Sequence, residues 1–128
     1  MRRDSRGLAL GACAGYQDQL QRGQRYYERN DFEVALALWR DLERNTSSLG
    51  PHDQTRYAYL RGMTDYRLGF NADARHWLAL AHANEVMHPG GLPNTWATRL
   101  DETLKTLRSS QPGTPRPREP VQTIEATP

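Results

Sequence analysis

The sequence contains a single cysteine and no long apolar run. Cys13 is the only thiol in 128 residues, so an intrachain disulfide and a multi-cysteine metal site are both excluded. No apolar segment approaches the roughly 18 to 20 residues that a membrane-spanning helix requires. The length allows one domain with a core large enough to fold alone. We therefore expect one soluble folded body with a modest core.

Net charge is also small, at +2, and it comes from the first twelve residues. Arg2, Arg3 and Arg6 face one acid there, Asp4, whereas basic and acidic side chains balance over the remainder. A nucleic-acid-binding domain normally concentrates lysine and arginine on its folded part. The balanced body therefore predicts that nucleic acid is not a partner.

Residue patterns that would support catalysis or metal binding are missing as well. The four histidines are at positions 52, 76, 82 and 88, and the last three are spaced by six residues. None of these pairs shares a helix face at the i, i+4 spacing of a zinc-binding helix. No serine–histidine–acid or cysteine–histidine pattern has recognisable local context, and Gly90-Gly91 is typical of a helix stop rather than a phosphate loop. We predict neither an enzyme nor a bound metal or cofactor.

Composition divides the chain into three parts. Residues 1–15 form a basic and then apolar leader, and residues 16–108 are rich in apolar and charged residues with breakers at 88–94. Residues 109–128 contain five prolines and almost no large hydrophobic residues. Such a tail cannot bury enough apolar surface to offset its ordering entropy, so we expect it to be disordered.

Apolar residues in the central part recur at helical spacing. Phe32, Ala35, Leu36, Trp39 and Leu42 form one stripe, and similar stripes occur at 74–81 and 96–107. No segment alternates with the period of two that is typical of a half-buried strand. The fold class is therefore predicted to be all-α, with helices near 15–29, 31–45, 52–68, 71–86 and 94–108.

The expected helix starts carry familiar signals. Asn30 lies three residues before Glu33, which is the spacing of a capping box. Asn71 precedes the fourth expected helix, and Pro51 fits the first turn of the third.

An internal repeat of 39 residues is the most informative feature of the sequence. Gly23 aligns with Gly62, Tyr27 with Tyr66 and Ala35 with Ala74, whereas Trp39 and Trp77 fall one position apart in this register. A small residue on each of two antiparallel helices lets them approach closely, and bulky aromatics fill the gaps beside the crossing. The repeat predicts two helical hairpins.

This pattern of small and aromatic residues resembles the tetratricopeptide repeat (TPR). The first repeat matches the pattern well, with Asn30 in place of the turn glycine, because asparagine tolerates left-handed backbone. The second departs from the usual acidic–aromatic pair at Phe70-Asn71, and the repeat is longer than the usual one. The resemblance implies two helix-turn-helix repeats with the helix at 94–108 as a cap. An ordinary helical bundle with a chance repeat is the alternative.

The resemblance also implies a role as a protein-binding scaffold with a groove lined by the first helix of each repeat. The candidate groove residues are Gln24, Tyr27, Arg56, Tyr59, Met63, Tyr66 and Arg67. Burial in the core is the competing interpretation for the aromatic ones. The lysine and asparagine residues with which chaperone-binding repeats clamp a terminal carboxylate are absent, since Leu20, Gln24 and Tyr59 occupy the matching positions. Arg56, Arg61 and Arg67 are candidates for contact with an acidic partner, and a solvated charged face is the competing interpretation.

The leader resembles a bacterial lipoprotein signal. Leu10-Gly11-Ala12-Cys13 matches the motif at which a signal peptidase cuts before an acylated cysteine. The apolar run is shorter than the roughly 7 to 15 residues of such signals, and Asp4 interrupts the basic region. The resemblance implies lipid anchoring through Cys13 and a cell-envelope location facing the periplasm. A cytoplasmic TPR-type adaptor or peptide-binding chaperone, with Cys13 incidental, is the alternative.

Overall fold

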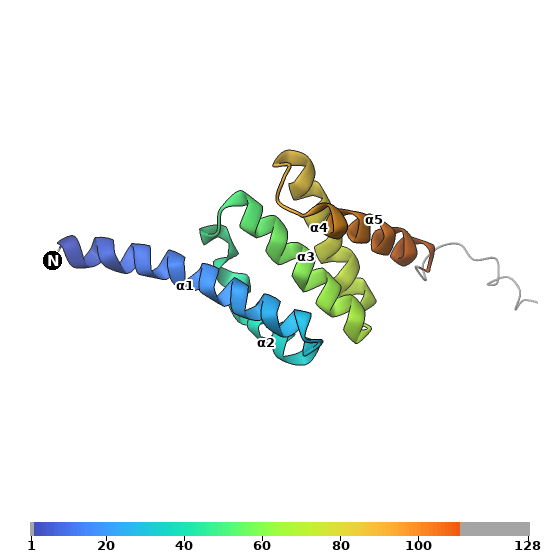
Figure 1. The fold of residues 1–128 in the computed structure, drawn as a ribbon, viewed down its shortest axis with the longest axis horizontal. Helices are drawn as coiled ribbons and strands as arrows, with labels where there is room; N and C mark the ends of the chain where they lie inside the picture. Colours follow the sequence, from blue (N-terminus) through green and yellow to red (C-terminus); the bar gives the residue numbers. More distant parts are fainter. Residues whose placement is uncertain (1, 111–128) are drawn as a thin grey trace, which may run out of the picture.

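In the part of the chain that it describes, the computed structural model contains helices joined by turns and short loops, and no strand (Figure 1). It describes the backbone of residues 2–110 and the side chains of residues 15–110. The predicted all-α class is therefore confirmed for these residues. The elements are α1 (Arg2–Glu28), α2 (Phe32–Leu42), a 3-10 helix η1 (Glu43–Ser48), α3 (Pro51–Leu68), α4 (Asn71–Met87) and α5 (Asn94–Ser109).

Most helix ends agree with the sequence expectations to within a few residues, but two differ. The α1 backbone is helical from Arg2 rather than from about residue 15, and no proline precedes Pro51 to interrupt it. The second helix tightens into η1 after Leu42. The predicted disorder of the tail concerns residues that, from 111 onward, lie outside the described part.

The helices form two hairpins and a covering helix. Helix α1 packs against α2, and α3 packs even more extensively against α4. Contacts of α2 and α1 with α3 join the hairpins, and α5 packs against α4. In Figure 1, α3 runs between α1 and α5. Helix α1 contacts α3, and Tyr59 of α3 stacks on Trp96 of α5. The surface that these three neighbouring helices present is called the α1–α3–α5 face.

The two hairpins cross at equivalent residues, 39 positions apart. A Cβ atom added to Gly23 would overlap the indole of Trp39, and one added to Gly62 would lie 2.6 Å from Cγ of Leu78. Trp39 and Leu78 are both fully buried, as are Ala35 and Ala74 one turn earlier. The structural equivalent of Trp39 is therefore Leu78, not the neighbouring tryptophan. Close approach of the paired helices requires glycine at both crossings.

The turns inside the two hairpins also share one conformation. Asn30 (φ 67°) and Gly69 (φ 88°) are both left-handed, and Asp31 (φ −88°, ψ 68°) matches Phe70 (φ −86°, ψ 73°). The backbone N–H groups of these last two residues donate to carbonyls five residues earlier, at 2.9 and 2.8 Å. The expected tolerance of Asn30 for left-handed backbone is confirmed.

The predicted caps are not formed. Asn30 lies in the left-handed turn, so it cannot cap α2 together with Glu33; Asp31 occupies the N-cap position and makes no side-chain capping bond. Phe70 holds the same position before α4, again without a side-chain bond. Pro51, in contrast, opens α3 as expected.

Helix α3 is the centre of the core. Every residue from Tyr57 to Asp65 is buried, because α2 and α4 cover its two sides. The predicted stripes supply much of the rest: Ala35, Leu36, Trp39 and Leu42 are buried. Leu100, Leu104 and Leu107 of α5 are buried as well, whereas Trp77, Trp96 and Phe32 are half-buried.

The glycine-rich segment after α4 is held by local hydrogen bonds. Gly90 has φ +100°, and the backbone N–H groups of Gly90 and Gly91 donate to the carboxylate of Glu85 at 2.8 and 3.1 Å. His52 Nε2 lies 3.1 Å from the carbonyl oxygen of Pro89. The expected helix stop is confirmed, and these N–H groups are occupied by the protein's own acid.

Candidate protein interaction surface

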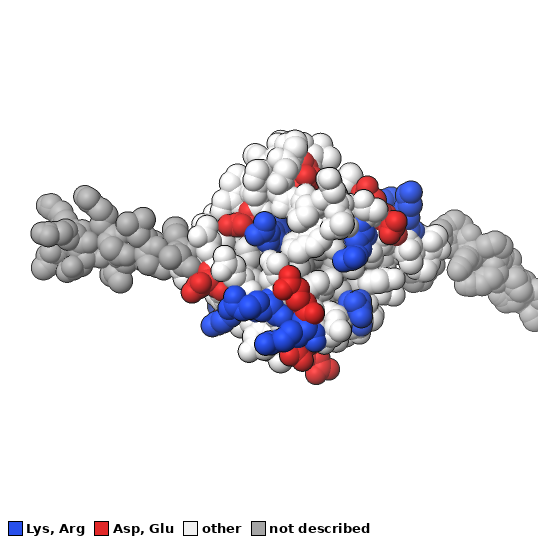
Figure 2. All heavy atoms as spheres, viewed as in Figure 1, with Lys and Arg blue, Asp and Glu red and all other residues white. Residues whose placement is uncertain are grey.

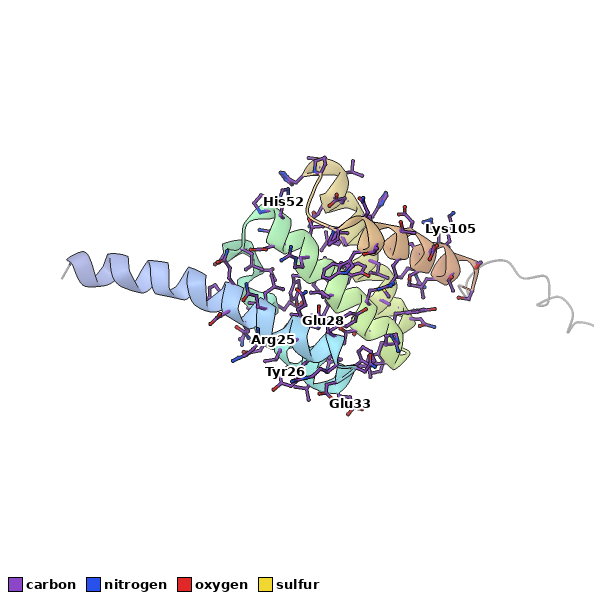
Figure 3. All side chains as sticks on the ribbon, in the orientation of Figure 1. Arg25, Tyr26, Glu28, Glu33, His52 and Lys105 are labelled. Carbon is purple, nitrogen blue, oxygen red and sulfur yellow. The ribbon has the colours of Figure 1, made fainter. Side chains whose placement is uncertain are left out.

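Charged side chains of both signs are interspersed on the side of the molecule that Figure 2 shows, with a group of basic side chains over α1. Gln24 and Arg56 are half-buried where α1 meets α3. They line a shallow polar depression together with Gln21, Arg25 and Glu28; Figure 3 labels the last two on α1. The Gln24 amide donates to Glu28 at 3.0 Å. Two of the candidate groove residues therefore share one surface hollow.

Two other candidate groove residues belong to the core. Tyr59 is fully buried and Met63 is 3% exposed, so neither offers surface to a partner. The Tyr59 ring stacks on Trp96 of α5 with centroids 4.9 Å apart and planes at 17°. Because α5 covers this part of α3, the prediction that Tyr59 and Met63 line a groove is corrected. Sequence spacing on α3 alone cannot show which positions another helix covers.

An aromatic and basic cluster forms where α1, α2 and α3 converge. The Tyr27 and Phe32 rings meet edge to face with centroids 5.6 Å apart. The guanidinium carbon of Arg67 lies 4.6 Å from the centroid of the same Phe32 ring. Tyr27 is half-buried and Arg67 is exposed, and Tyr66, one residue earlier, is half-buried. Tyr27 and Arg67 are therefore accessible in part and share Phe32 as a contact, whereas Tyr66 packs against the core.

Arg99 of α5 completes this cluster. Burial raises the pKa of Tyr27, and the nearby charges of Arg99 and then Arg67 oppose that rise. Burial raises the pKa of Tyr59 to about 12, an effect that the Tyr27 hydroxyl reinforces and Arg99 opposes. Arg99 is therefore close to both phenols, and its side chain opposes the rise in each pKa by hydrogen bonding as well as by charge. Sequence reasoning missed Arg99; its spacing of three from Trp96 on one helix was the available signal.

Arg61 is structural rather than a surface contact. Its Nη1 donates to Glu43 Oε1 and to the Tyr57 hydroxyl, both at 3.0 Å. Its guanidinium carbon lies 4.7 Å from the ring centroid of Trp77. With 6% of the residue exposed, Arg61 cannot meet an acidic partner, and that expectation is corrected. Arg56 and Arg67 stay candidates.

Asp65 is buried beside Arg61 on the same helix. Its Oδ2 lies 3.6 Å from Arg61 Nε, and neither carboxylate oxygen accepts a hydrogen bond from any described residue. Burial raises the pKa of Asp65 to about 6 against the opposing charge of Arg61, with Asp73 and Arg40 as smaller influences. Its position in the centre of the core therefore disfavours the charged form of this carboxyl group.

Within residues 15–110, no three histidine, cysteine, aspartate or glutamate side chains converge as a metal ion would require. His52 is bound to a loop carbonyl, and His82 Nδ1 lies 3.9 Å from Asp101. No described helix combines the length and apolar character needed to cross a bilayer. The side chain of Cys13 lies outside the described residues.

Comparison with known proteins yields no match to a family model, to a curated protein or to a solved structure.

Proposed function

We propose that the chain is a non-enzymatic protein interaction scaffold of the TPR type. The two repeats are the α1–α2 and α3–α4 hairpins, and α5 is the capping helix. The observation that carries the proposal is the recurrence, after 39 residues, of both the glycine crossing and the left-handed turn. A chance resemblance between two hairpins would not require the same contact and the same backbone angles at one common spacing.

The proposed binding surface is the α1–α3–α5 face. It presents amide, arginine and tyrosine side chains from three helices, and arginine and tyrosine are enriched where interfaces gain most of their affinity. Its shallow depression at Gln24 and Arg56 suits an extended peptide or a partner helix better than a small molecule, which needs an enclosed site.

Site-specific photo-crosslinking in the native host tests this surface. A photoreactive amino acid is placed at Gln21 or Arg25, both exposed on α1, and in a control at Ala83, exposed on α4. We expect one partner to be captured from both α1 positions and not from α4. Capture of the same partner with equal yield from Ala83, or none from α1, would contradict the assignment.

We propose in addition that Cys13 anchors this scaffold to a membrane of the bacterial envelope, facing the periplasm. The sequence Leu10-Gly11-Ala12-Cys13 supports this. Labelling with radioactive palmitate should mark the wild-type protein and not Cys13→Ser, which should leave the membrane fraction. An unlabelled wild-type protein in the cytoplasm would instead support the cytoplasmic adaptor, with the same binding face.

A further inference from the structure

We infer that a row of amide side chains on α1, beside α3, binds the main chain of an extended and uncharged peptide segment of the partner. The segment lies along α1 and is held by its backbone amide groups rather than by its side chains. The row, which we call the glutamine row, consists of Gln17, Gln21 and Gln24, followed by Glu28. The inference rests on the proposed function, because it names how the α1–α3–α5 face recognises a partner.

The glutamine row follows the line where α1 meets α3. Its members are spaced by four, three and four residues, which places them on one face of a helix. At one end, Gln17 donates to Asp53 of α3 at 3.2 Å. The other three members line the hollow of about 280 Å³ together with Arg25 and with Arg56 of α3. One face of α1 therefore offers its polar groups to whatever occupies this hollow.

The spacing of the row suits an extended chain. Alternate residues of an extended peptide present their N–H and C=O groups to the same edge, at intervals of about 6.6 Å. Residues four apart on a helix are separated by about 6 Å along its axis, so two of the three steps in the row are close to that interval. The whole row spans about 16 Å, which is the length of about five extended residues.

A glutamine side chain carries the same two groups as a peptide bond. Its amide has N–H donors and a carbonyl acceptor, so it can bond to a backbone C=O and to a backbone N–H. Gln21 is exposed, and its side chain forms no hydrogen bond within residues 15–110. The Gln24 nitrogen donates to Glu28 at 3.0 Å, which leaves its carbonyl oxygen as an acceptor. These groups match a peptide main chain whatever side chains it carries.

The charges around the hollow favour an uncharged segment. Arg25 and Arg56 are offset by Glu28 and by Asp53, whose carboxylate lies 4.0 Å from Arg56. Because neither sign dominates, a peptide with charge of one sign gains no net attraction. All five residues that line the hollow are polar or charged, so they form no apolar pocket for an anchoring side chain. The main chain is the part of a partner that this surface complements.

The experiment is a titration of the full chain followed by NMR of the glutamine side-chain N–H signals. The probe is an acetylated and amidated heptapeptide of alternating threonine and serine. The signals of Gln21 and Gln24 should shift. Those of Gln19 and Gln54, which are bonded within the protein at 3.0 and 2.9 Å, should not.

A second peptide tests the main chain directly. It has the same side chains, but ester oxygens replace the backbone N–H groups of its five central residues. This ester analogue should bind about tenfold more weakly, because it cannot donate to the glutamine carbonyls. Equal binding of the two peptides would overturn main-chain recognition.

Charged analogues of the heptapeptide separate main-chain from side-chain recognition. Replacing its serines by glutamate or by lysine should leave the affinity within about threefold of that of the uncharged peptide. If the glutamate analogue binds about tenfold more tightly, Arg25 and Arg56 select an acidic side chain and the inference is overturned.

Matched variants of the protein locate the binding on the row. Gln21→Ala/Gln24→Ala should weaken binding of the uncharged heptapeptide about tenfold through the loss of two amides. Asp18→Ala/Arg22→Ala, at exposed positions of α1 outside the row, should retain the wild-type affinity. Alanine is the strongest helix former, so both variants should keep the fold. Equal weakening by the two variants would overturn the inference.

Failure here and failure of the proposed function give different results. If the heptapeptide does not bind, or shifts only signals outside the row, main-chain recognition is wrong. The scaffold proposal is then still decided by crosslinking from Arg25, a position that leaves the glutamine row intact.

Discussion

The two hairpins share one backbone design but differ in the residues that fill it. At the helix crossing, Gly23 meets a tryptophan in the first hairpin and Gly62 meets a leucine in the second. The Trp39 indole also donates to Thr64 of α3 at 3.0 Å, so the first crossing is bonded to the second hairpin. Leu78 can make no such bond. The repeated pattern therefore fixes how close the helices lie, and the larger residue additionally fixes how the hairpins join.

The first helices of the two hairpins, α1 and α3, also differ in burial. From Tyr57 to Asp65, α3 has no exposed residue, whereas the described part of α1 has exposed residues in nearly every turn. The reason is the position of α3, which lies between its hairpin partner α4 and the α1–α2 hairpin. One consequence is that polar residues of α3, such as Arg61 and Asp65, become core residues.

The largest difference in stability between the hairpins is expected when the side chain that packs on each crossing glycine is truncated to alanine. Trp39→Ala should lower the free energy of unfolding by about 3 to 5 kcal/mol, and Leu78→Ala by about 2 to 4 kcal/mol. The tryptophan variant should cost more because it also leaves the Thr64 hydroxyl without its indole donor. Urea denaturation measures both; a smaller loss for Trp39→Ala would show that the hairpins are not joined there.

Adding a methyl group at each crossing glycine is the next test. Gly23→Ala and Gly62→Ala should each destabilise by about 1 to 3 kcal/mol through overpacking. Gly62→Ala should cost more, since its Cβ would also lie 3.0 Å from the backbone nitrogen of Leu78. Gly15→Ala is the control, because no atom lies within 4 Å of its Cβ. That variant should be stabilised by about 0.5 to 1 kcal/mol, and stabilisation of all three would refute close packing.

Acidification should act on the second hairpin through Asp65. Burial raises its pKa from 3.8 to about 6, so the folded state binds more protons than the unfolded state between these values. The contribution of Asp65 to stability is therefore fully present below pH 3.8 and is lost as the pH rises through about 6. We expect that loss to be about 1 to 3 kcal/mol.

Asp65→Asn should abolish this component, while Asp18→Asn, exposed on α1, should keep the wild-type pH profile. Urea denaturation between pH 4 and pH 7.5 measures the difference. Identical profiles for wild type and Asp65→Asn would show that burial does not raise the pKa of Asp65.

Substitutions in the two left-handed turns should give the smallest difference in stability. Gly69→Ala forces a Cβ into left-handed backbone and should cost about 1 kcal/mol, whereas Asn30→Gly relieves the same strain and should gain a few tenths of a kcal/mol. Thermal unfolding of the two variants is the measurement. Opposite signs are expected; equal losses would mean that the Asn30 side chain, not its backbone angle, matters.

Local patterns in the sequence predicted much of this fold. Helical periodicity gave the all-α class and most helix bounds, and the spacing of Gly23 and Gly62 gave the two close crossings, because both depend on residues of one hairpin. The 39-residue register is confirmed: it pairs Trp39 with Leu78, and Trp77 lies one position out of that register, as the alignment of Gly23 with Gly62 indicated.

The candidate surface was less predictable because it depends on contacts between hairpins. Tyr59 and Met63 have a spacing that suits a groove, but α5 and the rest of the core cover them. Arg61 looks like a surface charge in the sequence, yet Glu43, 18 residues away in the chain, lies beside it only after folding. Arg99 lies on the last helix, and its spacing of three residues from Trp96 is the only signal of it in the sequence.

The most direct test of the central claim is backbone hydrogen exchange of the chain alone and bound to the partner captured by crosslinking. Protection should increase at exchangeable sites in α1 and α5 and at the exposed C-terminal end of α3, around Arg67. The outer residues of α2 and of α4 near Ala83 should be unchanged. Protection confined to α2 and α4, with none on α1 or α5, would contradict the assignment of the α1–α3–α5 face as the binding surface.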